Sequence, residues 1–157
     1  FWGEGPEAET LAERVAAAYR ASDGDIPAML RALFLAPEFA RAPRLIKRPF
    51  DLLVGAVRAT GALTDGDQGI QRHLEAMGQP LFQWPMPDGY PVRSGAWAGS
   101  LLPRWNFALA LAKNEIPGTR LDPKEALERL GPLAPKDGGT PAERVALALC
   151  SPDFQWR

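Results

Sequence analysis

Residues 101–111, LLPRWNFALAL, predict the helix around which the rest of the chain is built. Leu101, Trp105 and Ala108 recur at helical spacing, and the same stripe continues to Ala112. Other leucines widen this stripe until the segment is apolar nearly all round. Because a helix of this kind is usually buried, we expect it at the centre of the molecule, with these four residues facing inward.

The same periodicity predicts helices on both sides of this segment, so we expect an all-α fold. A proline in the first turn or a capping side chain marks most of their starts, and a glycine or a proline marks most of their ends. No stretch alternates between apolar and polar residues in the manner of a strand. The chain is therefore expected to form a single helical domain over residues 1–157, with about seven helices at 6–22, 25–37, 49–61, 64–78, 100–112, 122–131 and 140–150.

Three of these helix starts depend on particular capping residues. Thr64 is expected to cap the fourth helix, because Asp67 follows three residues later, as in a capping box. Ser100 is the expected cap of the central helix. The last helix has the clearest start, since Thr140 is followed by a proline and then by Glu143 at the third helical position.

Charge and composition exclude several classes of protein. The 18 basic and 19 acidic residues give a net charge of -1, which argues against nucleic acid as a partner. No apolar run reaches the roughly 18 residues of a transmembrane helix. Cys150 is the only cysteine and His73 the only histidine, so neither an internal disulfide nor a zinc site of several Cys and His ligands can be built. We therefore expect no metal and no cofactor.

Motifs for catalysis are missing from the sequence as well. There is no Gly-x-Ser-x-Gly nucleophile elbow and no glycine-rich phosphate loop. A Ser-His-Asp triad would have to use His73, which borders the apolar face of its helix between Ile70 and Met77. A histidine in such a position usually serves packing. The sequence leans away from an enzyme, but it contains nothing that excludes one.

One long segment interrupts the helices. Residues 78–97, GQPLFQWPMPDGYPVRSGAW, combine prolines, glycines and aromatic rings. Connections longer than roughly 12–15 residues are uncommon in compact domains, and disordered linkers are poor in aromatic residues. We therefore expect an ordered loop over residues 78–99, extended at its prolines and held in place by its rings.

Two roles are open for the rings of this segment. They can fill the gaps between helices, which would make them part of the core. They can instead line a concavity together with nearby charged groups, as in aromatic-lined sites for small molecules or sugars. On the second interpretation the candidate binding residues are Trp84, Asp88, Tyr90, Arg93, Trp97 and Arg104.

Several stretches together resemble one bacterial family. They are GQPLF at residues 78–82, PDGYP at 87–91, Trp97 and LLPRWNFALAL at 101–111. Three further stretches fit the same pattern in the same order, namely APEF at 36–39, IKRPFDLLVGAVRATG at 46–61 and ALCSPDFQ at 148–155. The family that they resemble is known only as domain of unknown function 1800, and many of its members carry a tryptophan where this chain has Tyr90.

The resemblance implies a largely helical fold and a piece of a longer protein. Members of the family are longer than this chain, which resembles their C-terminal portion, and the unusual start Phe1-Trp2 agrees with a fragment. Many members carry export signals, which implies a periplasmic or secreted location. The partner would then be the N-terminal portion of the same protein or another exported protein. No reaction and no catalytic residue is established for the family.

Three functional hypotheses follow. The first is a non-catalytic binding or assembly module of an exported bacterial protein, with residues 79–97 as its surface. The second is a hydrolytic enzyme that acts on cell-envelope or polysaccharide material and takes part of its site from a missing N-terminal portion. The third is a purely structural scaffold, in which the aromatic segment is core. Full burial of Trp84 and Tyr90 would favour the third hypothesis over the first.

Overall fold

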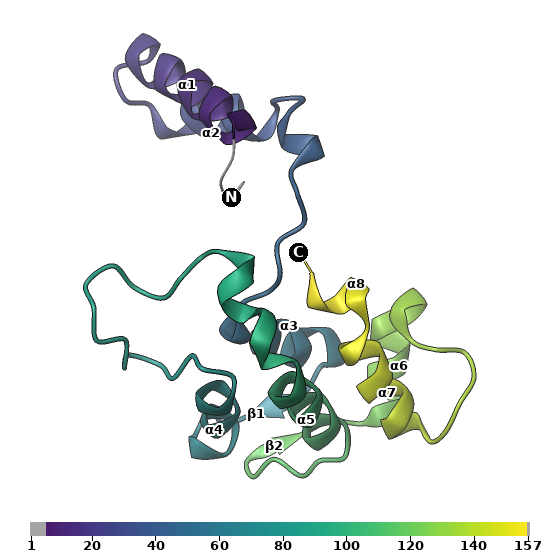
Figure 1. Ribbon diagram of the computed structural model, residues 1–157. Coiled ribbons are helices and arrows are strands. Elements are labelled where there is room, and N and C mark those ends of the chain that lie inside the picture. Colours follow the sequence, from purple (N-terminus) through teal and green to yellow (C-terminus); the bar gives the residue numbers. More distant parts are fainter. Residues whose placement is uncertain (1–5, 157) are drawn as a thin grey trace. The chain divides into compact units, whose positions relative to one another are not determined.

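The computed structural model describes residues 6–156 and is mostly helical in that range, which confirms the predicted all-α class (Figure 1). The α-helices are α1 (Pro6–Ala21), α2 (Ile26–Phe34), α3 (Pro49–Thr60), α4 (Gln68–Ala76), α5 (Leu101–Ala112), α6 (Pro123–Leu130), α7 (Pro141–Cys150) and α8 (Pro152–Gln155). The shorter elements are the 3-10 helices η1 (Phe39–Arg41), η2 (Ser94–Ser100) and η3 (Gly131–Leu133) and the antiparallel strands β1 (Leu63–Thr64) and β2 (Thr119–Arg120). None of these helices is long and apolar enough to cross a lipid bilayer.

The contacts between residues divide the chain into two compact units, Phe1–Leu45 and Ile46–Arg157. A single domain was the expectation from sequence. Each unit has a buried cluster of its own. The first unit has a small one around Leu11 and Ala36, and the second has a large one to which the helices from α3 to α8 contribute.

In the first unit, α1 and α2 pack against each other around Leu11. Asp25 caps α2 as predicted, since its carboxylate accepts a hydrogen bond from the backbone N–H of Ala28 at 2.8 Å. Phe34, at the end of this helix, meets Phe39 edge to face, with 5.2 Å between the ring centres. The chain that follows α2 therefore folds back onto the end of the helix.

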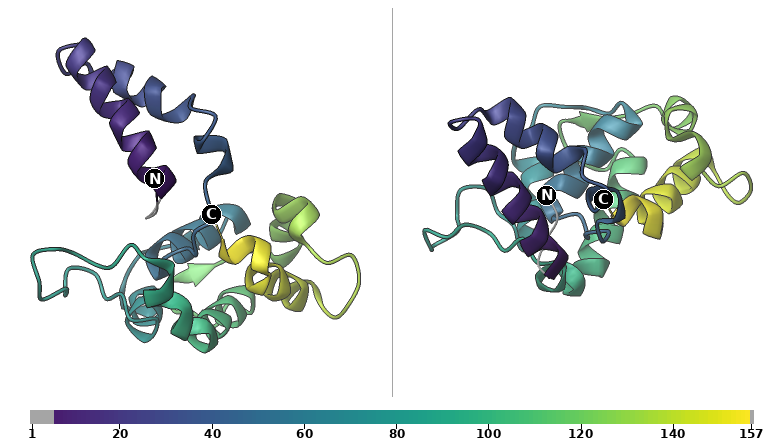
Figure 2. Two further views of the ribbon diagram at one scale, coloured as in Figure 1. Left: turned by 45° about the horizontal axis from the view of Figure 1, so that its top comes forward. Right: turned by 90° about the horizontal axis from the view of Figure 1, so that it is seen from above.

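In the second unit, α5 lies beside the other helices (Figure 2), but it is buried along one face only, whereas its apolar composition predicted a central, buried helix. It packs mainly on α7 and also contacts α4, while α6 packs on both α7 and α3. Large apolar side chains that are almost fully buried come from α3, α4, α5, α7 and the loop after α5: Leu52, Leu74, Phe107, Leu111, Ile116, Val145 and Leu149. Helix packing around α5 thus forms the main core.

The inward face of α5 differs from the predicted one. The prediction that Leu101 and Trp105 face inward is wrong, because both side chains are exposed. Since the helix is apolar nearly all round, its periodicity alone could not select a face. The residues of α5 that are buried are Arg104, Phe107, Ala108, Leu111 and Ala112.

Two of the predicted capping residues have other roles. Thr64 lies in β1, and its hydroxyl shares a hydrogen bond of 2.8 Å with that of Thr119 in β2. Asp67 caps α4 instead, because its carboxylate accepts a hydrogen bond from the N–H of Gln68 at 2.7 Å. Ser100 precedes α5 but makes no side-chain capping bond to it. The two strands, each of two residues, are too short to show an alternating pattern, so the sequence did not predict them.

Two other helix boundaries follow the predictions. At the start of α7, the N–H of Glu143 donates to Thr140 Oγ1 at 3.3 Å, and the N–H of Thr140 donates to the Glu143 carboxylate at 2.6 Å. At the end of α3, Gly61 adopts the left-handed conformation with φ of 70°. These boundaries depend on neighbouring residues only, which is why the sequence contains them.

The two ends of the second unit lie side by side. Ile46 and Trp156 form an isolated antiparallel bridge, and the N–H of Lys47 donates to the carbonyl of Gln155 at 2.9 Å. The ammonium of Lys47 donates to the carbonyl of Phe154 at 2.6 Å and lies 4.0 Å from the centre of that ring. Burial lowers the pKa of Lys47. The residues that open the unit therefore pair with those that close it.

Candidate functional site

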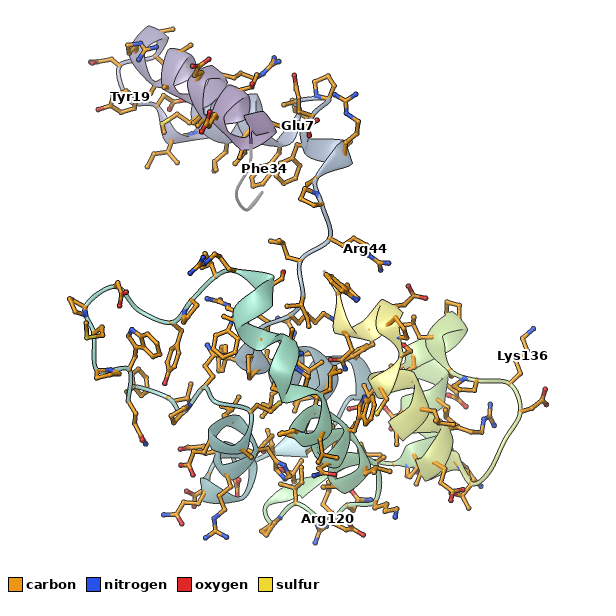
Figure 3. The ribbon with its side chains drawn as sticks, in the orientation of Figure 1. Glu7, Tyr19, Phe34, Arg44, Arg120 and Lys136 are labelled. Atoms are coloured by element: carbon orange, nitrogen blue, oxygen red, sulfur yellow. The ribbon has the colours of Figure 1, made fainter. Side chains whose placement is uncertain are left out.

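The predicted proline- and aromatic-rich segment forms a long loop between α4 and η2, and we call residues 78–93 the arm (Figure 1). Figure 3 shows its side chains, with rings lying between its two limbs. The arm begins next to Gln79, whose buried side-chain oxygen accepts a hydrogen bond from the N–H of Phe50 at 2.9 Å. Because Phe50 belongs to the first turn of α3, this end of the arm is fixed to the core.

Two aromatic residues hold the limbs of the arm together. The indole N–H of Trp84 donates to Asp88 Oδ1 at 2.9 Å, and the hydroxyl of Tyr90 donates to the carbonyl of Pro80. The rings of Trp84 and Tyr90 lie 4.8 Å apart, centre to centre, and both side chains are half-buried. These contacts agree with the expectation that the rings hold the segment in place.

Trp97 fixes the other end of the arm. Its residue is only 5% exposed, and its indole N–H donates to the carbonyl of Pro91 at 2.9 Å. Its ring centre lies 6.2 Å from that of Tyr90, and its carbonyl accepts a hydrogen bond from the Ser100 hydroxyl at 2.9 Å. Trp97 is therefore part of the packing between the arm and η2.

Arg104 is the second buried residue of the predicted site, with 0% of its surface exposed. Its guanidinium donates to Ser100 Oγ at 2.9 Å, to Gln155 Oε1 at 3.1 Å and to the carbonyl of Lys47 at 2.7 Å. Burial lowers the pKa of Arg104, yet a guanidinium keeps its proton at neutral pH. Arg104 therefore links α5 to η2, to α8 and to the residues before α3.

The structure brings four of the six predicted site residues together. Ring and hydrogen-bond contacts run without a break from Asp88 through Trp84 and Tyr90 to Trp97. Arg93 directly follows this part of the arm and is exposed. The buried Arg104 is linked to this series through the Ser100 hydroxyl, which accepts from its guanidinium and donates to the carbonyl of Trp97.

The arm exposes several apolar side chains, which were not predicted from the sequence. Phe82, Met86 and Val92 are exposed, and Phe82 is exposed completely. Phe82 also has a positive φ of 59°, a conformation that costs an L-residue about 1–2 kcal/mol. The sequence contains one sign of this surface, because residues 78–87 include no charged side chain.

An apolar groove lies among η2, α5, α7 and α8. Its volume is about 520 Å³, and its walls include Ile46, Leu101, Trp105, Cys150 and Trp156, so we call it the Trp105–Trp156 groove. Trp105 is 45% exposed and Trp156 is 37% exposed, which leaves both indole rings available for contact. Burial raises the pKa of the Cys150 thiol. None of the residues among 6–156 that line the groove carries a charge.

A second groove continues from the first along α5 and α7. Its volume is about 700 Å³, and it shares Trp105 and Cys150 with the first groove while adding Leu109 and Leu147 to the lining. Both of these leucines are exposed. Part of the face of α5 that the sequence predicted as core therefore lines grooves instead.

Groups for acid–base or metal chemistry do not gather in the part of the chain that the structure describes. No three His, Cys, Asp or Glu side chains lie close enough there to share a metal ion. The second groove has one carboxylate, Glu143, which is engaged in the cap of α7. His73 lies with its ring 5.5 Å from that of Phe107, and burial lowers its pKa. This position at the border of the core agrees with the interpretation of His73 as a packing residue.

These observations define the class of structure as a helical protein with a long arm that its own aromatic residues hold in shape. The chain belongs to the family described as Protein of unknown function (DUF1800), whose model matches residues 1–156. This match confirms the resemblance that the arm and the central helix indicated. No curated protein and no solved structure matches the chain.

Proposed function

We propose that this chain is a non-catalytic binding or assembly module. Its contact surface is the segment of residues 79–97, which comprises most of the arm and the start of η2. One observation carries the proposal. The polar groups of the arm's rings bind within the arm, whereas Phe82, Met86 and Val92 are left in solvent. An exposed apolar surface of this kind, presented in a fixed conformation, is characteristic of an interaction site.

The backbone of Phe82 supports the same proposal. A positive φ and full exposure are both unfavourable for a phenylalanine. Backbone strain of this kind is concentrated at functional sites. A partner that buried the ring would gain about 1.5–3 kcal/mol from the burial alone.

The braced conformation of the arm suits a protein partner. The side chains of Gln79, Trp84 and Tyr90 already fix the arm, so little conformational freedom remains to be lost on binding. Its prolines restrict the backbone further. Aromatic side chains and methionine are enriched at the centres of protein interfaces, which is the composition that the arm presents.

The cellular context in this proposal comes from the family resemblance alone. We propose that the chain is the C-terminal portion of an exported bacterial protein, periplasmic or secreted, whose arm meets the N-terminal portion of the same protein or another exported protein. A hydrolytic role on cell-envelope or polysaccharide material would need two carboxylates roughly 5–9.5 Å apart, and no observation favours it over binding. The burial of Trp97 supports the scaffold role, but that role does not explain why Phe82 is exposed.

The test places a photo-crosslinking amino acid at Phe82 or at Met86 of the full-length protein in the cells that produce it. The matched control carries the same amino acid at Glu128, an exposed position on α6. We expect discrete, light-dependent adducts from the two arm positions, identified by mass spectrometry, and none from the control. If the arm positions give no adduct, or the same adducts as the control, the arm is not a contact surface.

A further inference from the structure

We propose that Pro85, Met86 and Pro87 of the arm bind in the Trp105–Trp156 groove of a second copy of this chain. This inference rests on the proposed function and names the partner. Its basis is a pair of complementary surfaces within one unit. The second unit carries an exposed proline-rich segment and, at a separate place, an apolar groove lined by indole rings.

The groove has the chemistry that recognises proline-rich segments. Such segments bind in grooves lined by aromatic side chains, against which the proline rings lie flat. Trp105 and Trp156 supply two partly exposed indoles, and Ile46 and Leu101 supply further apolar surface. The volume of about 520 Å³ falls within the roughly 300–1,000 Å³ of sites that enclose small ligands. A short apolar segment therefore fits this groove in both chemistry and size.

The arm has the chemistry of the corresponding ligand. Pro85, Met86 and Pro87 are all exposed. Each proline ring fixes its own φ, and each proline also biases the residue before it toward an extended conformation. The segment is thus restricted before it binds, which reduces the entropy lost on association. Met86, which is flexible and polarizable, can adapt to an irregular apolar wall.

The two surfaces are also compatible in charge. The described residues that line the groove are uncharged, and residues 78–87 of the arm are uncharged too. Contact between the two surfaces would therefore bury no unpaired charge, which is the condition that most restricts apolar interfaces.

The arm is held away from the groove of its own chain. In Figure 1 and in the left view of Figure 2, the arm and α8 lie on opposite sides of α5. Gln79 and Trp97 fix the two ends of the arm, and Tyr90 joins its limbs. Reaching the groove within one chain would require breaking these contacts. A second copy can bring its groove to the arm with every one of them intact.

Because the arm and the groove are different surfaces, copies can join in an isologous pair or in a heterologous, head-to-tail series. Two copies can each place an arm in the other's groove, or successive copies can add in one direction. In both arrangements, a copy with a defective arm still has a good groove, and a copy with a defective groove still has a good arm. Two different defective copies should therefore bind each other.

The test measures the mass of the full chain in solution by analytical ultracentrifugation over a range of concentrations. Met86→Asp places a charge on the arm, and Trp105→Ala removes one aromatic wall of the groove. Each is expected to weaken self-association at least about tenfold, as the loss of a central interface residue does. Leu63→Ser is the matched control, since Leu63 is an exposed apolar residue of β1 outside both surfaces. This control should associate like the unaltered chain.

Folding of each variant is checked by circular dichroism and thermal unfolding. Met86 is 59% exposed and Trp105 is 45% exposed, and neither belongs to the buried core, so both variants are expected to fold. Should Trp105→Ala unfold, Leu101→Ser replaces it as the groove variant, because Leu101 is also an exposed lining residue.

Mixing the two variants decides the question. An equimolar mixture of Met86→Asp and Trp105→Ala should form a one-to-one complex through one intact arm–groove contact, and this complex should be stronger than the self-association of either variant alone. The proposal is overturned if the unaltered chain is monomeric at every concentration, if the mixture does not associate, or if Leu63→Ser loses association as well.

Photo-crosslinking from Met86 separates this inference from the proposed function. Adducts to α5 or α8 of a second copy support both. Adducts to a different protein, from a chain that remains monomeric, overturn self-association and leave the proposed function standing. No adduct at all overturns both.

Discussion

The Nη2 atom of Arg104 lies 2.7 Å from the carbonyl oxygen of Lys47, and this hydrogen bond links the central helix to the start of the second unit. The same guanidinium binds Ser100 and Gln155. One side chain thus connects α5, η2 and α8 to the residues that precede α3. These three partners are uncharged, so the arginine stabilises the unit through hydrogen bonds rather than through an ion pair.

Replacing Arg104 should destabilise the protein strongly. Arg104→Met keeps much of the side-chain volume but removes all the donors. The buried acceptors on Lys47 and Gln155 would each lose a partner, at about 1–3 kcal/mol apiece. We expect the free energy of unfolding, measured by urea denaturation, to fall by about 2–6 kcal/mol. Arg93→Met, at an exposed position, should change it by no more than about 0.5 kcal/mol. Similar losses for the two variants would show that the link is dispensable.

The two tryptophans of the predicted site should differ in their effect on stability. Trp97 is buried, so Trp97→Ala should reduce the free energy of unfolding by about 3–5 kcal/mol, as large-to-small core changes do. Trp84 is only half-buried, and its ring packs within the arm, so Trp84→Ala should cost less than half as much. Chemical denaturation of both variants measures the difference. A loss for Trp84→Ala as large as that for Trp97→Ala would assign the whole arm to the core.

Replacing Phe82 should not destabilise the chain. Asparagine tolerates a positive φ better than phenylalanine does, and the exposed ring contributes no burial that could be lost. Phe82→Asn is therefore expected to raise the free energy of unfolding by a few tenths of a kcal/mol to about 1 kcal/mol, while it weakens any contact that the arm makes. The control is Val92→Asn, an exposed arm residue without a positive φ, which should change stability by no more than about 0.5 kcal/mol. A clear loss of stability in Phe82→Asn would contradict the exposed position of the ring.

The cap of α7 should give a pH-dependent contribution to stability. Hydrogen bonds from the backbone and side chain of Thr140 lower the pKa of Glu143 below its ordinary value of 4.5. A carboxylate whose pKa is lower in the folded state adds stability that is complete above that ordinary value and is lost as the pH falls through the folded value. The melting temperature of Glu143→Ala should therefore lie below that of the unaltered chain at pH 7, and the difference should shrink near pH 3. A difference that is the same at both pH values would rule out this role of the carboxylate. Glu128→Ala serves as the control for an exposed glutamate outside a cap.

Local signals explain which elements the sequence predicted. The starts of α2, α6 and α7 depend on Asp25, Asp122 and Thr140, each of which binds N–H groups two or three residues further on. Such bonds need no other part of the chain, so a short stretch of sequence contains them in full. At α4 two residues of this kind compete, and Asp67 becomes the cap because Thr64 pairs with Thr119 across the small sheet. That pairing is a tertiary contact, which the local pattern does not include.

Tertiary contacts also explain what the sequence did not predict about the site. The burial of Arg104 depends on acceptors from Lys47 and Gln155, which are far from it in sequence. An arginine is expected at the surface unless such partners are known. The Trp105–Trp156 groove likewise exists only where η2, α5 and α8 meet. The sequence predicted the ordered arm because its prolines and rings are contiguous, but not which of its side chains face solvent.

The bridge between Ile46 and Trp156 has a consequence for how the protein is made. Lys47 and Phe154, which bind beside this bridge, are 107 positions apart. Contacts between such distant residues require a large loop to close and therefore form late in folding. A ribosome that adds about 5–20 residues per second completes α3 several seconds before it reaches the partners of Lys47. Until Gln155 has emerged, the guanidinium of α5 lacks one of its acceptors, so the second unit cannot complete its packing before its last residues are made.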